Sequence, residues 1–231
     1  MKIQVAEIFE SLSGEVGGFQ QGSPTLFLRL AGCFLHCPFC DTEWACDPMA
    51  GEEWNVDMLA GRLLEYGREQ ILITGGEPLL QKEALKELIF KLKKRDPMVQ
   101  IQVETNGTLP IGTQYMVDYW VVDCKGMDAM GRVPYTFYPG DLGINGCYVK
   151  FVVASWADVD RAFEQAAEML KTWPWIGLTI SPIMNKPLGA FGYRSFPNGI
   201  VIDLETLAKR IIESKLPITL NLQLHKLIGV A

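Results

Sequence analysis

The chain has 231 residues, of which 48% are hydrophobic and 21% are charged, and 21 lysines and arginines against 27 aspartates and glutamates give a formal net charge of −6. This composition is typical of a globular protein and excludes disordered, collagen-like and coiled-coil chains, and the length suggests one domain or at most two. No apolar run approaches the roughly 18 residues of a membrane-spanning helix, and the N-terminus lacks the apolar core of a signal peptide. We therefore expect a cytoplasmic protein that is not embedded in a membrane and, being acidic, does not bind nucleic acid nonspecifically.

Eight short apolar runs, bounded by glycine, proline or asparagine, predict buried strands. They cover residues 3–9, 25–30, 71–74, 99–104, 119–123, 148–153, 176–180 and 218–222. Between several of these runs, apolar residues spaced three and four positions apart predict four amphipathic helices. The four apolar faces lie within residues 56–64, 84–92, 159–170 and 204–212.

This alternation of strands and helices predicts an α/β fold of βαβ units around a largely parallel sheet. A complete eightfold barrel takes about 250 residues and eight helices, so four helices for eight strands indicate a partial TIM-like barrel with some helical crossovers reduced to loops. We expect residues 1–231 to form a single domain. Ligands of such sheets bind at the carboxyl ends of the strands, so the residues that follow each strand are the candidates for a site.

Six cysteines in a cytosolic chain are more often metal-binding or catalytic than disulfide-bonded. Cys33, Cys37 and Cys40 have the spacing C-x3-C-x2-C directly after the predicted strand 25–30, which allows three thiolates to face one metal centre. The other three, Cys46, Cys124 and Cys147, are scattered. An ordinary iron–sulfur cluster has four thiolate ligands, so three would leave one iron open for a substrate or cofactor.

Other interpretations of the cysteine loop remain open at this point. A structural zinc site needs four ligands, and His36 or Cys46 would be the fourth. Cys37 and Cys40 form a C-x2-C pair of the thioredoxin-like kind. Incidental buried cysteines are a third possibility.

Two further motifs follow predicted strands. In Gly75-Gly76-Glu77-Pro78 the glycines let the backbone approach a ligand closely and Glu77 adds a carboxylate, although a strand-to-helix turn with Glu77 in the first helical turn would give the same pattern. Glu104 and Asn106 end the next strand, where Asn106-Gly107 is also an ordinary turn signal.

The cysteine spacing, the aromatic residue before the third cysteine and the Gly-Gly-Glu motif together resemble the signature of the radical S-adenosylmethionine (SAM) superfamily. In that superfamily three cysteines hold a [4Fe–4S] cluster, and the fourth iron chelates SAM. The resemblance implies that Cys33, Cys37 and Cys40 are the cluster ligands. The SAM contacts that it implies are Phe39, Asp41, Gly75, Gly76, Glu77, Glu104, Asn106, Lys125 and Ser181.

Four further segments narrow the resemblance. They are residues 7–15, 29–33, 40–42 and 222–226. Together they resemble the 7-carboxy-7-deazaguanine synthase family of radical SAM lyases, from about residue 7 to the C-terminus, with 125–175 the least recognisable interval. The resemblance implies that 6-carboxy-5,6,7,8-tetrahydropterin is converted to 7-carboxy-7-deazaguanine, by ring contraction with loss of ammonia, in the deazapurine pathway that leads to queuosine.

The same resemblance implies a substrate site and a Mg2+ ion. The substrate contacts that it implies are Leu12, Ser13, Gly14, Glu15, Arg29, Thr74, Gln223 and His225. Thr42 would be a ligand of Mg2+. The C-terminal tail, residues 218–231, would close over the substrate site, and we expect residues 185–199 to form a loop or lid. We also expect a homodimer that receives electrons from a flavodoxin- or ferredoxin-type donor.

Three positions depart from the family pattern. Ser13 stands where the family usually has glutamine, Asp123-Cys124-Lys125 stands for Ser-Pro-Lys, and Ser181-Pro182 stands for Gln-Pro. Two alternative functions follow from the motifs. One is a glycyl-radical-enzyme activating enzyme, which has the same cysteine spacing but acts on a protein loop. The other is a binding module stabilised by zinc.

Overall fold

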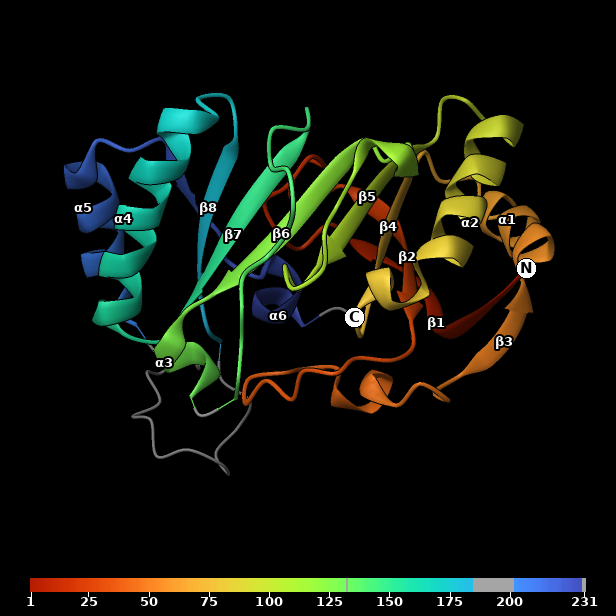
Figure 1. Cartoon of the computed structure of the whole chain (residues 1–231), viewed down its shortest axis with the longest axis horizontal. Coiled ribbons are helices and arrows are strands. Elements are labelled where there is room, and N and C mark those ends of the chain that lie inside the picture. Colours follow the sequence, from red (N-terminus) through yellow and green to blue (C-terminus); the bar gives the residue numbers. More distant parts are fainter. Residues whose placement is uncertain (132, 185–201, 230–231) are drawn as a thin grey trace.

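An open, curved nine-stranded sheet forms the centre of the computed structural model, which describes residues 1–131, 133–184 and 202–229 (Figure 1). The strands are β1 (Lys2–Leu12), β2 (Pro24–Leu30), β3 (Glu52–Asn55), β4 (Gln70–Gly75), β5 (Gln100–Thr105), β6 (Tyr119–Lys125), β7 (Cys147–Val153), β8 (Gly177–Pro182) and β9 (Ile218–Leu220). Their order in the sheet is β3-β1-β2-β4-β5-β6-β7-β8-β9. All neighbours from β2 to β9 are parallel, whereas β1 pairs antiparallel with β2 and β3.

The predicted partial barrel is confirmed. All eight predicted strands form. Seven of them, β2 and β4 to β9, lie in the parallel part of the sheet, where strands are covered on both faces and therefore consist of nearly continuous apolar runs. Within the described residues the sheet does not close into a barrel, and its two ends are β3 and β9. The sequence did not predict β3, an edge strand with two charged residues that pairs with β1 alone.

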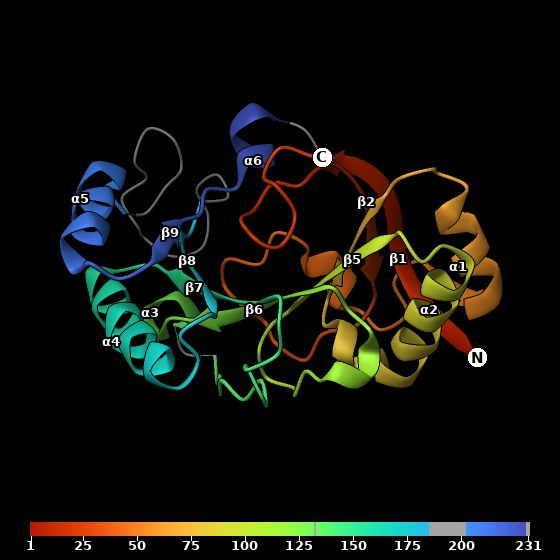
Figure 2. The same cartoon turned by 90° about the horizontal axis from the view of Figure 1, so that it is seen from above.

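Four longer helices cover the outside of the sheet near its two ends. They are α1 (Val56–Leu64), α2 (Lys82–Arg95), α4 (Trp156–Thr172) and α5 (Leu204–Ser214). Figure 2 shows α1 and α2 outside one end of the arc and α4 and α5 outside the other. The predicted faces are buried in α1 and α2, but Ile212 on α5 is exposed, so the apolar face of α5 is narrower than its sequence spacing predicted.

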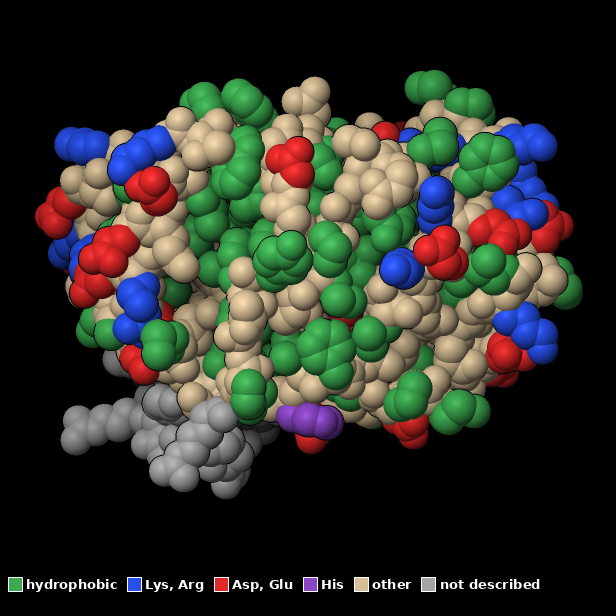
Figure 3. Space-filling view, viewed as in Figure 1, with side chains coloured by type: hydrophobic (Ala, Val, Ile, Leu, Met, Phe, Trp, Pro, Cys, Tyr) green, Lys and Arg blue, Asp and Glu red, His purple; other side chains and the backbone are tan. Residues whose placement is uncertain are grey.

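The middle of the sheet has short connections in place of long helices. The crossover from β5 to β6 contains the 3-10 turn η3 (Thr113–Tyr115), and the crossover from β6 to β7 contains the four-residue α3 (Met127–Met130). The remaining short elements are η1 (Glu43–Cys46), η2 (Pro78–Gln81) and α6 (Leu224–Ile228). On the face shown in Figure 3, hydrophobic and uncharged side chains gather in the centre and most charges lie towards the two ends.

Within the described part of the chain, no helix has the length and apolar character needed to cross a membrane. The expected loop at 185–199 lies outside the described residues.

Candidate active site

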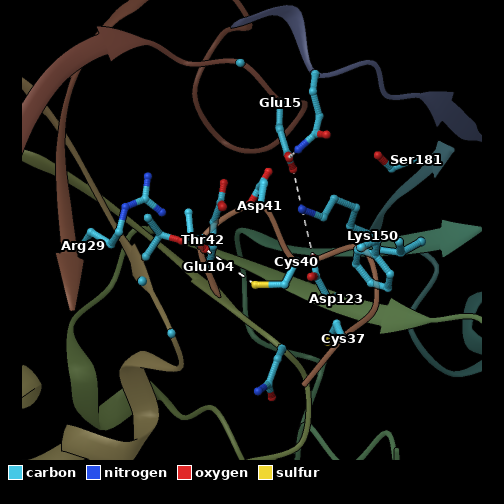
Figure 4. A pocket seen from close by; sticks show the side chains of 18 of the residues that line it. Glu15, Arg29, Cys37, Cys40, Asp41, Thr42, Glu104, Asp123, Lys150 and Ser181 are labelled. Carbon is cyan, nitrogen blue, oxygen red and sulfur yellow. Dashed lines mark hydrogen bonds and ion pairs between the residues drawn. The ribbon is translucent and has the colours of Figure 1, made fainter. Parts of the chain in front are cut away.

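A pocket of about 380 Å³ opens at the carboxyl ends of the parallel strands. Its wall combines the cysteine loop after β2 with the ends of β4 to β8, the loop after β1 and the C-terminal tail. A volume of this size lies in the range of small-molecule sites. Figure 4 shows that its charged side chains point from several strands into one shared space.

The three cysteines of the predicted cluster loop all line this pocket. Gly32, at φ +93°, turns the chain out of β2 immediately before Cys33. Burial raises the pKa of the Cys37 thiol to about 11 and also raises the pKa of Cys33. In the described residues, no three cysteine, histidine or acidic side chains converge closely enough to hold a single metal ion. Cys33, Cys37 and Cys40 line one pocket, and three thiols as its donor set fit a [4Fe–4S] group, in which each thiolate binds a different iron.

His36 and Cys46, the two alternative fourth ligands of a zinc site, differ in their position relative to the pocket. His36 is exposed and does not line the pocket, which disfavours it as a zinc ligand beside the three cysteines. Cys46 does line the pocket, and its backbone carbonyl accepts the N–H of Cys33 at 3.1 Å. Burial, with the neighbouring thiols of Cys40 and Cys33, raises the pKa of Cys46 to about 12.

The Gly-Gly-Glu motif ends β4 against the start of the cysteine loop. The backbone N–H of Gly76 donates to Leu30 at 2.9 Å, and the N–H of Glu77 donates to Gly32 at 2.7 Å. A Cβ on Gly76 would lie 2.1 Å from the carbonyl oxygen of Gly32, so a side chain there would push the two segments apart. Gly75 has φ +142° and is equally close to the backbone of Leu30. Both glycines line the pocket, as a SAM contact requires.

Glu77 does not line the pocket. Its side chain is fully buried, and its carboxylate accepts hydrogen bonds from the N–H of Leu79 at 3.0 Å, the hydroxyl of Thr105 at 2.8 Å and the N–H of Asn106 at 2.7 Å. Burial raises its pKa in spite of these three bonds. Glu77 therefore holds the end of β5 against the end of β4, and a direct contact between Glu77 and SAM stays a prediction.

The other predicted SAM contacts all line the pocket. The Lys125 ammonium lies 5.3 Å from the centroid of the Phe39 ring, and the Asn106 amide lies 3.9 Å from the Cys33 sulfur. Asp41 pairs with Lys226 of the tail, which keeps the pKa of Asp41 below its ordinary value although burial acts in the opposite direction. The remaining two are Glu104 and Ser181.

The carboxyl group of Glu104 has a raised pKa. Burial, together with the neighbouring charges of Glu15 and Asp123, raises its pKa to about 7, although Lys150 and Arg29 act against this shift. A carboxyl group with such a pKa exchanges its proton near neutral pH, which makes Glu104 a candidate proton donor or acceptor.

Six of the eight predicted substrate contacts line the pocket. They are Gly14, Glu15, Arg29, Thr74, Gln223 and His225. Arg29 pairs with Glu7 at 3.3 Å and stacks over Phe9. Gly14 lies directly under the ring of His225, where a Cβ would come within 1.9 Å of Nδ1, and burial lowers the pKa of this histidine.

The structure does not bring Leu12 and Ser13 to the pocket wall. Leu12 is the last residue of β1. Ser13 is buried, and its hydroxyl has no hydrogen-bond partner among the described residues. Their predicted substrate contacts remain untested.

Thr42 lines the pocket beside Cys40, with its hydroxyl 3.9 Å from the Cys40 sulfur. It precedes η1 but makes no capping hydrogen bond with its side chain. The hydroxyl of Thr42 is therefore not committed to the backbone, which leaves it available to a ligand in the pocket.

Three charged residues of the pocket, Asp123, Lys150 and Lys226, were not among the predicted contacts. Asp123 on β6 and Lys150 on β7 form an ion pair of 3.0 Å. Lys150 could have been recognised from the sequence. It is the one charged residue of the strand Cys147–Val153, and a buried lysine needs a partner.

Comparisons with known proteins agree with this geometry. Residues 28–118 match the Radical SAM superfamily. The 7-carboxy-7-deazaguanine synthase of Methanospirillum hungatei JF-1 is 36% identical over 230 residues, which cover 99% of this chain and 86% of the relative. The 7-carboxy-7-deazaguanine synthase of Hyperthermus butylicus is 44% identical over 177 residues, or 72% of each chain. The crystal structure of QueE from Escherichia coli shares the fold with a TM-score of 0.64 at 18% identity, over 97% of this chain and 95% of that one.

The open parallel sheet and the cysteine loop at its carboxyl edge are thus those of a radical SAM enzyme, as the sequence predicted. Within that class, the chain belongs to the 7-carboxy-7-deazaguanine synthase family. The superfamily implies a [4Fe–4S] cluster and SAM as cofactors.

A first prediction concerns the buried carboxylate of Glu77. The carboxylate accepts three hydrogen bonds, whereas the side chain of Glu77→Gln has an NH2 group in place of one oxygen. At least one donor would then lose its acceptor, so we expect the free energy of unfolding to fall by about 2 kcal/mol. Chemical denaturation under anaerobic conditions measures this change. Glu168→Gln, on an exposed side chain of α4, is the control and should change stability by less than about 0.5 kcal/mol. Equal stability of Glu77→Gln and the wild type would contradict the bracing role.

A second prediction concerns Glu104 and pH. Because its pKa is raised to about 7 from 4.5, the folded protein binds more protons than the unfolded chain between these values, and this group destabilises the fold as pH rises through that window. Glu104→Gln has no carboxyl group to ionise at this position and therefore does not lose stability in this pH window. We expect the variant to melt at a higher temperature than the wild type at pH 8, with a difference that shrinks towards pH 5. Thermal unfolding between pH 5 and pH 8 tests this, and a pH-independent difference would refute it.

Proposed function

We propose that the protein converts 6-carboxy-5,6,7,8-tetrahydropterin into 7-carboxy-7-deazaguanine, with contraction of the ring and loss of ammonia, in the deazapurine pathway that leads to queuosine. The observation that carries this proposal is the single pocket in which the cysteine loop faces charged groups from β2, β5, β6 and β7 and the C-terminal tail. Relatives that span most of this chain bear the name of that activity. A small-molecule substrate fits a pocket lined partly by a loop and a tail.

Cys33, Cys37 and Cys40 would hold the [4Fe–4S] cluster. The cluster and SAM, when bound, supply the radical that removes a hydrogen atom from a carbon that no side-chain base could deprotonate. The contribution of the protein is to orient the reactants and to exclude water. Asn106, near the Cys33 sulfur, and Lys125, over the Phe39 ring, are placed to position SAM beside the cluster.

On the substrate side, the charges of the pocket match those of a carboxylated pterin. Arg29 can hold a carboxylate through its planar, doubly donating guanidinium group. Glu15 offers acceptors to the N–H donors of the pterin ring, and the raised pKa of Glu104 equips it to exchange a proton with the ring during the rearrangement. Thr74, Gln223 and His225 complete this side of the wall.

Four further features belong to the same proposal. Mg2+ would bind the hydroxyl of Thr42 together with the substrate and water, since this ion favours oxygen ligands and keeps several waters. A homodimer would use the uncharged centre of the face in Figure 3, and the cluster would take its electrons from a flavodoxin- or ferredoxin-type donor. The reducing cytoplasm would be the compartment that keeps its six cysteines as thiols.

The deciding experiment is anaerobic reconstitution followed by incubation with SAM, dithionite and 6-carboxytetrahydropterin. We expect a product with the mass of 7-carboxy-7-deazaguanine, without one deoxyadenosine accumulating per product, because the family re-forms SAM. Formation of a glycyl radical on an added protein substrate, with no pterin turnover, would instead support the activating-enzyme alternative.

A third prediction separates the cluster ligands from Cys46. Each of Cys33→Ala, Cys37→Ala and Cys40→Ala should lose the cluster, whereas Cys46→Ala should keep about four irons per chain. Iron analysis and the visible absorption spectrum after reconstitution measure this without any turnover. Loss of the cluster in Cys46→Ala would show that three ligands are not sufficient, and zinc in place of iron would favour the zinc-binding module.

A fourth prediction concerns Thr42. Added Mg2+ should raise the activity of the wild type, and Thr42→Ala should blunt this response while it keeps the cluster and the affinity for SAM, because neither uses the hydroxyl. Product formation is measured against Mg2+ concentration in both proteins. An unchanged Mg2+ dependence in Thr42→Ala would remove the metal assignment and leave the radical SAM reaction in place.

A further inference from the structure

Lys150 is a buried cation in the middle of an apolar strand. Its side chain is 9% exposed, and its neighbours on β7, Val149 and Phe151, belong to the hydrophobic core. The chain places the ammonium group at the pocket wall, where Figure 4 shows it between Glu15 and Asp123. A charge buried to this extent has to be paired, so its partners define its role.

Lys150 has two ion-pair partners. One is Asp123, whose Oδ1 lies 3.0 Å from Nζ, and the other is Glu15, with which Nζ makes a short hydrogen bond. Burial alone would lower the pKa of Lys150, but Asp123, Glu15 and Glu104 raise it well above its ordinary value. Asp123 also has a second cation, because Lys125 pairs with its other oxygen. Lys150 is therefore not required to neutralise Asp123, and its bond to Glu15 is the contact that needs an explanation.

Glu15 lies where the loop after β1 meets the C-terminal tail. Its Oε1 accepts a hydrogen bond from the Gln223 amide at 2.7 Å, while Oε2 takes the bond from Lys150. The loop and the tail are also joined directly, because the N–H of Leu224 donates to the carbonyl of Gly14 at 2.8 Å. The pair Lys150–Glu15 is thus the attachment of this joined loop and tail to the sheet on the pocket side, beside the bonds that Gly18 and Phe19 donate to Gln102 of β5.

The same bonds fix the direction of the Glu15 carboxylate. A carboxylate has about four lone-pair sites, and Lys150 and Gln223 use one on each oxygen. The remaining sites can accept the two adjacent N–H donors of an aminopyrimidinone ring, which the pterin presents. Without Lys150, Oε2 of Glu15 would lose its ionic partner on the sheet and would no longer be held at the pocket wall.

We propose that Lys150 is a positioning residue for the pterin, acting through Glu15: it holds the Glu15 carboxylate towards the pocket and keeps the loop after β1 closed. This inference rests on the proposed function for the identity of the ligand. Lys150 does not contact the pterin in this arrangement, so its effect on binding disappears when Glu15 loses its charge.

The test measures pterin binding to the cluster-loaded protein without reductant, so that no turnover occurs. Titrations compare the wild type with Lys150→Met, Lys150→Arg, Glu15→Gln and the double variant Glu15→Gln/Lys150→Met. Lys171→Met, an exposed lysine on α4, is the matched control for the loss of one positive charge. SAM affinity and hydrogen–deuterium exchange of residues 13–22 are measured on the same samples.

We expect Lys150→Met to weaken pterin binding at least tenfold, Lys150→Arg to recover part of this loss, and Lys171→Met to have no effect. In the Glu15→Gln background, Lys150→Met should change the affinity less than twofold. SAM affinity should stay within twofold of the wild type in all variants, and residues 13–22 should exchange faster in Lys150→Met. Should Lys150→Met fail to fold, Lys150→Arg and Glu15→Gln still report on the pair.

Three results would overturn the role of Lys150. They are unchanged pterin affinity in Lys150→Met, an equal loss of affinity in the Glu15→Gln background, and a parallel loss of SAM affinity, which would indicate a general disturbance of the pocket. A wild-type protein that binds no pterin at all would instead refute the proposed function. In that case unchanged exchange of residues 13–22 in Lys150→Met would also refute the closing role, and faster exchange would support it.

Discussion

The buried residue Glu77 joins the three strand ends on which the site is built. Its backbone N–H donates to Gly32 at the exit of β2, and its carboxylate accepts hydrogen bonds from Thr105 and Asn106 at the end of β5. The cysteine loop starts directly after Gly32, and Asn106 is a candidate SAM contact. The relative position of the cysteine loop and the end of β5 therefore depends on a carboxylate that itself lies outside the pocket wall, where its bonds are shielded from water and are correspondingly strong.

The pocket balances its charges among neighbouring strands. Asp123 lies between Lys125 and Lys150, and Lys150 extends this chain of ion pairs to Glu15. Glu104 lies beside this chain of ion pairs. Burial, with the neighbouring charges of Glu15 and Asp123, raises its pKa to about 7 against the opposing effect of Lys150 and Arg29. A carboxyl group with this pKa, next to carboxylates that are paired with lysines, is suited to exchange a proton near neutral pH.

Local patterns predicted most of the fold and placed the cysteine loop after a strand. Apolar runs predicted β1 and the seven strands of the parallel part, which are buried on both faces, and the cysteine spacing is a property of eight consecutive residues. The charge network of the pocket could not be predicted in this way. The contact between Lys150 and Glu15 joins residues 135 positions apart and depends on the register of β6 and β7 and on the path of the loop after β1. The edge strand β3 was not predicted because it has only four residues, two of them glutamates, and so shows no apolar run or alternation.

An open sheet leaves its two ends apart, and here segments other than strands span the opening. The loop after β1 starts near one end of the sheet and the tail after β9 starts at the other, yet they meet through the bond between Leu224 and Gly14 and through Gln21, whose amide donates to Leu222 at 2.7 Å. A closed barrel would fix this side of the pocket by strand pairing. Hydrogen bonds between a loop and a tail can instead separate without disturbing the sheet, so the side of the pocket lined by Glu15 and His225 is held by weaker links than the strand pairing elsewhere.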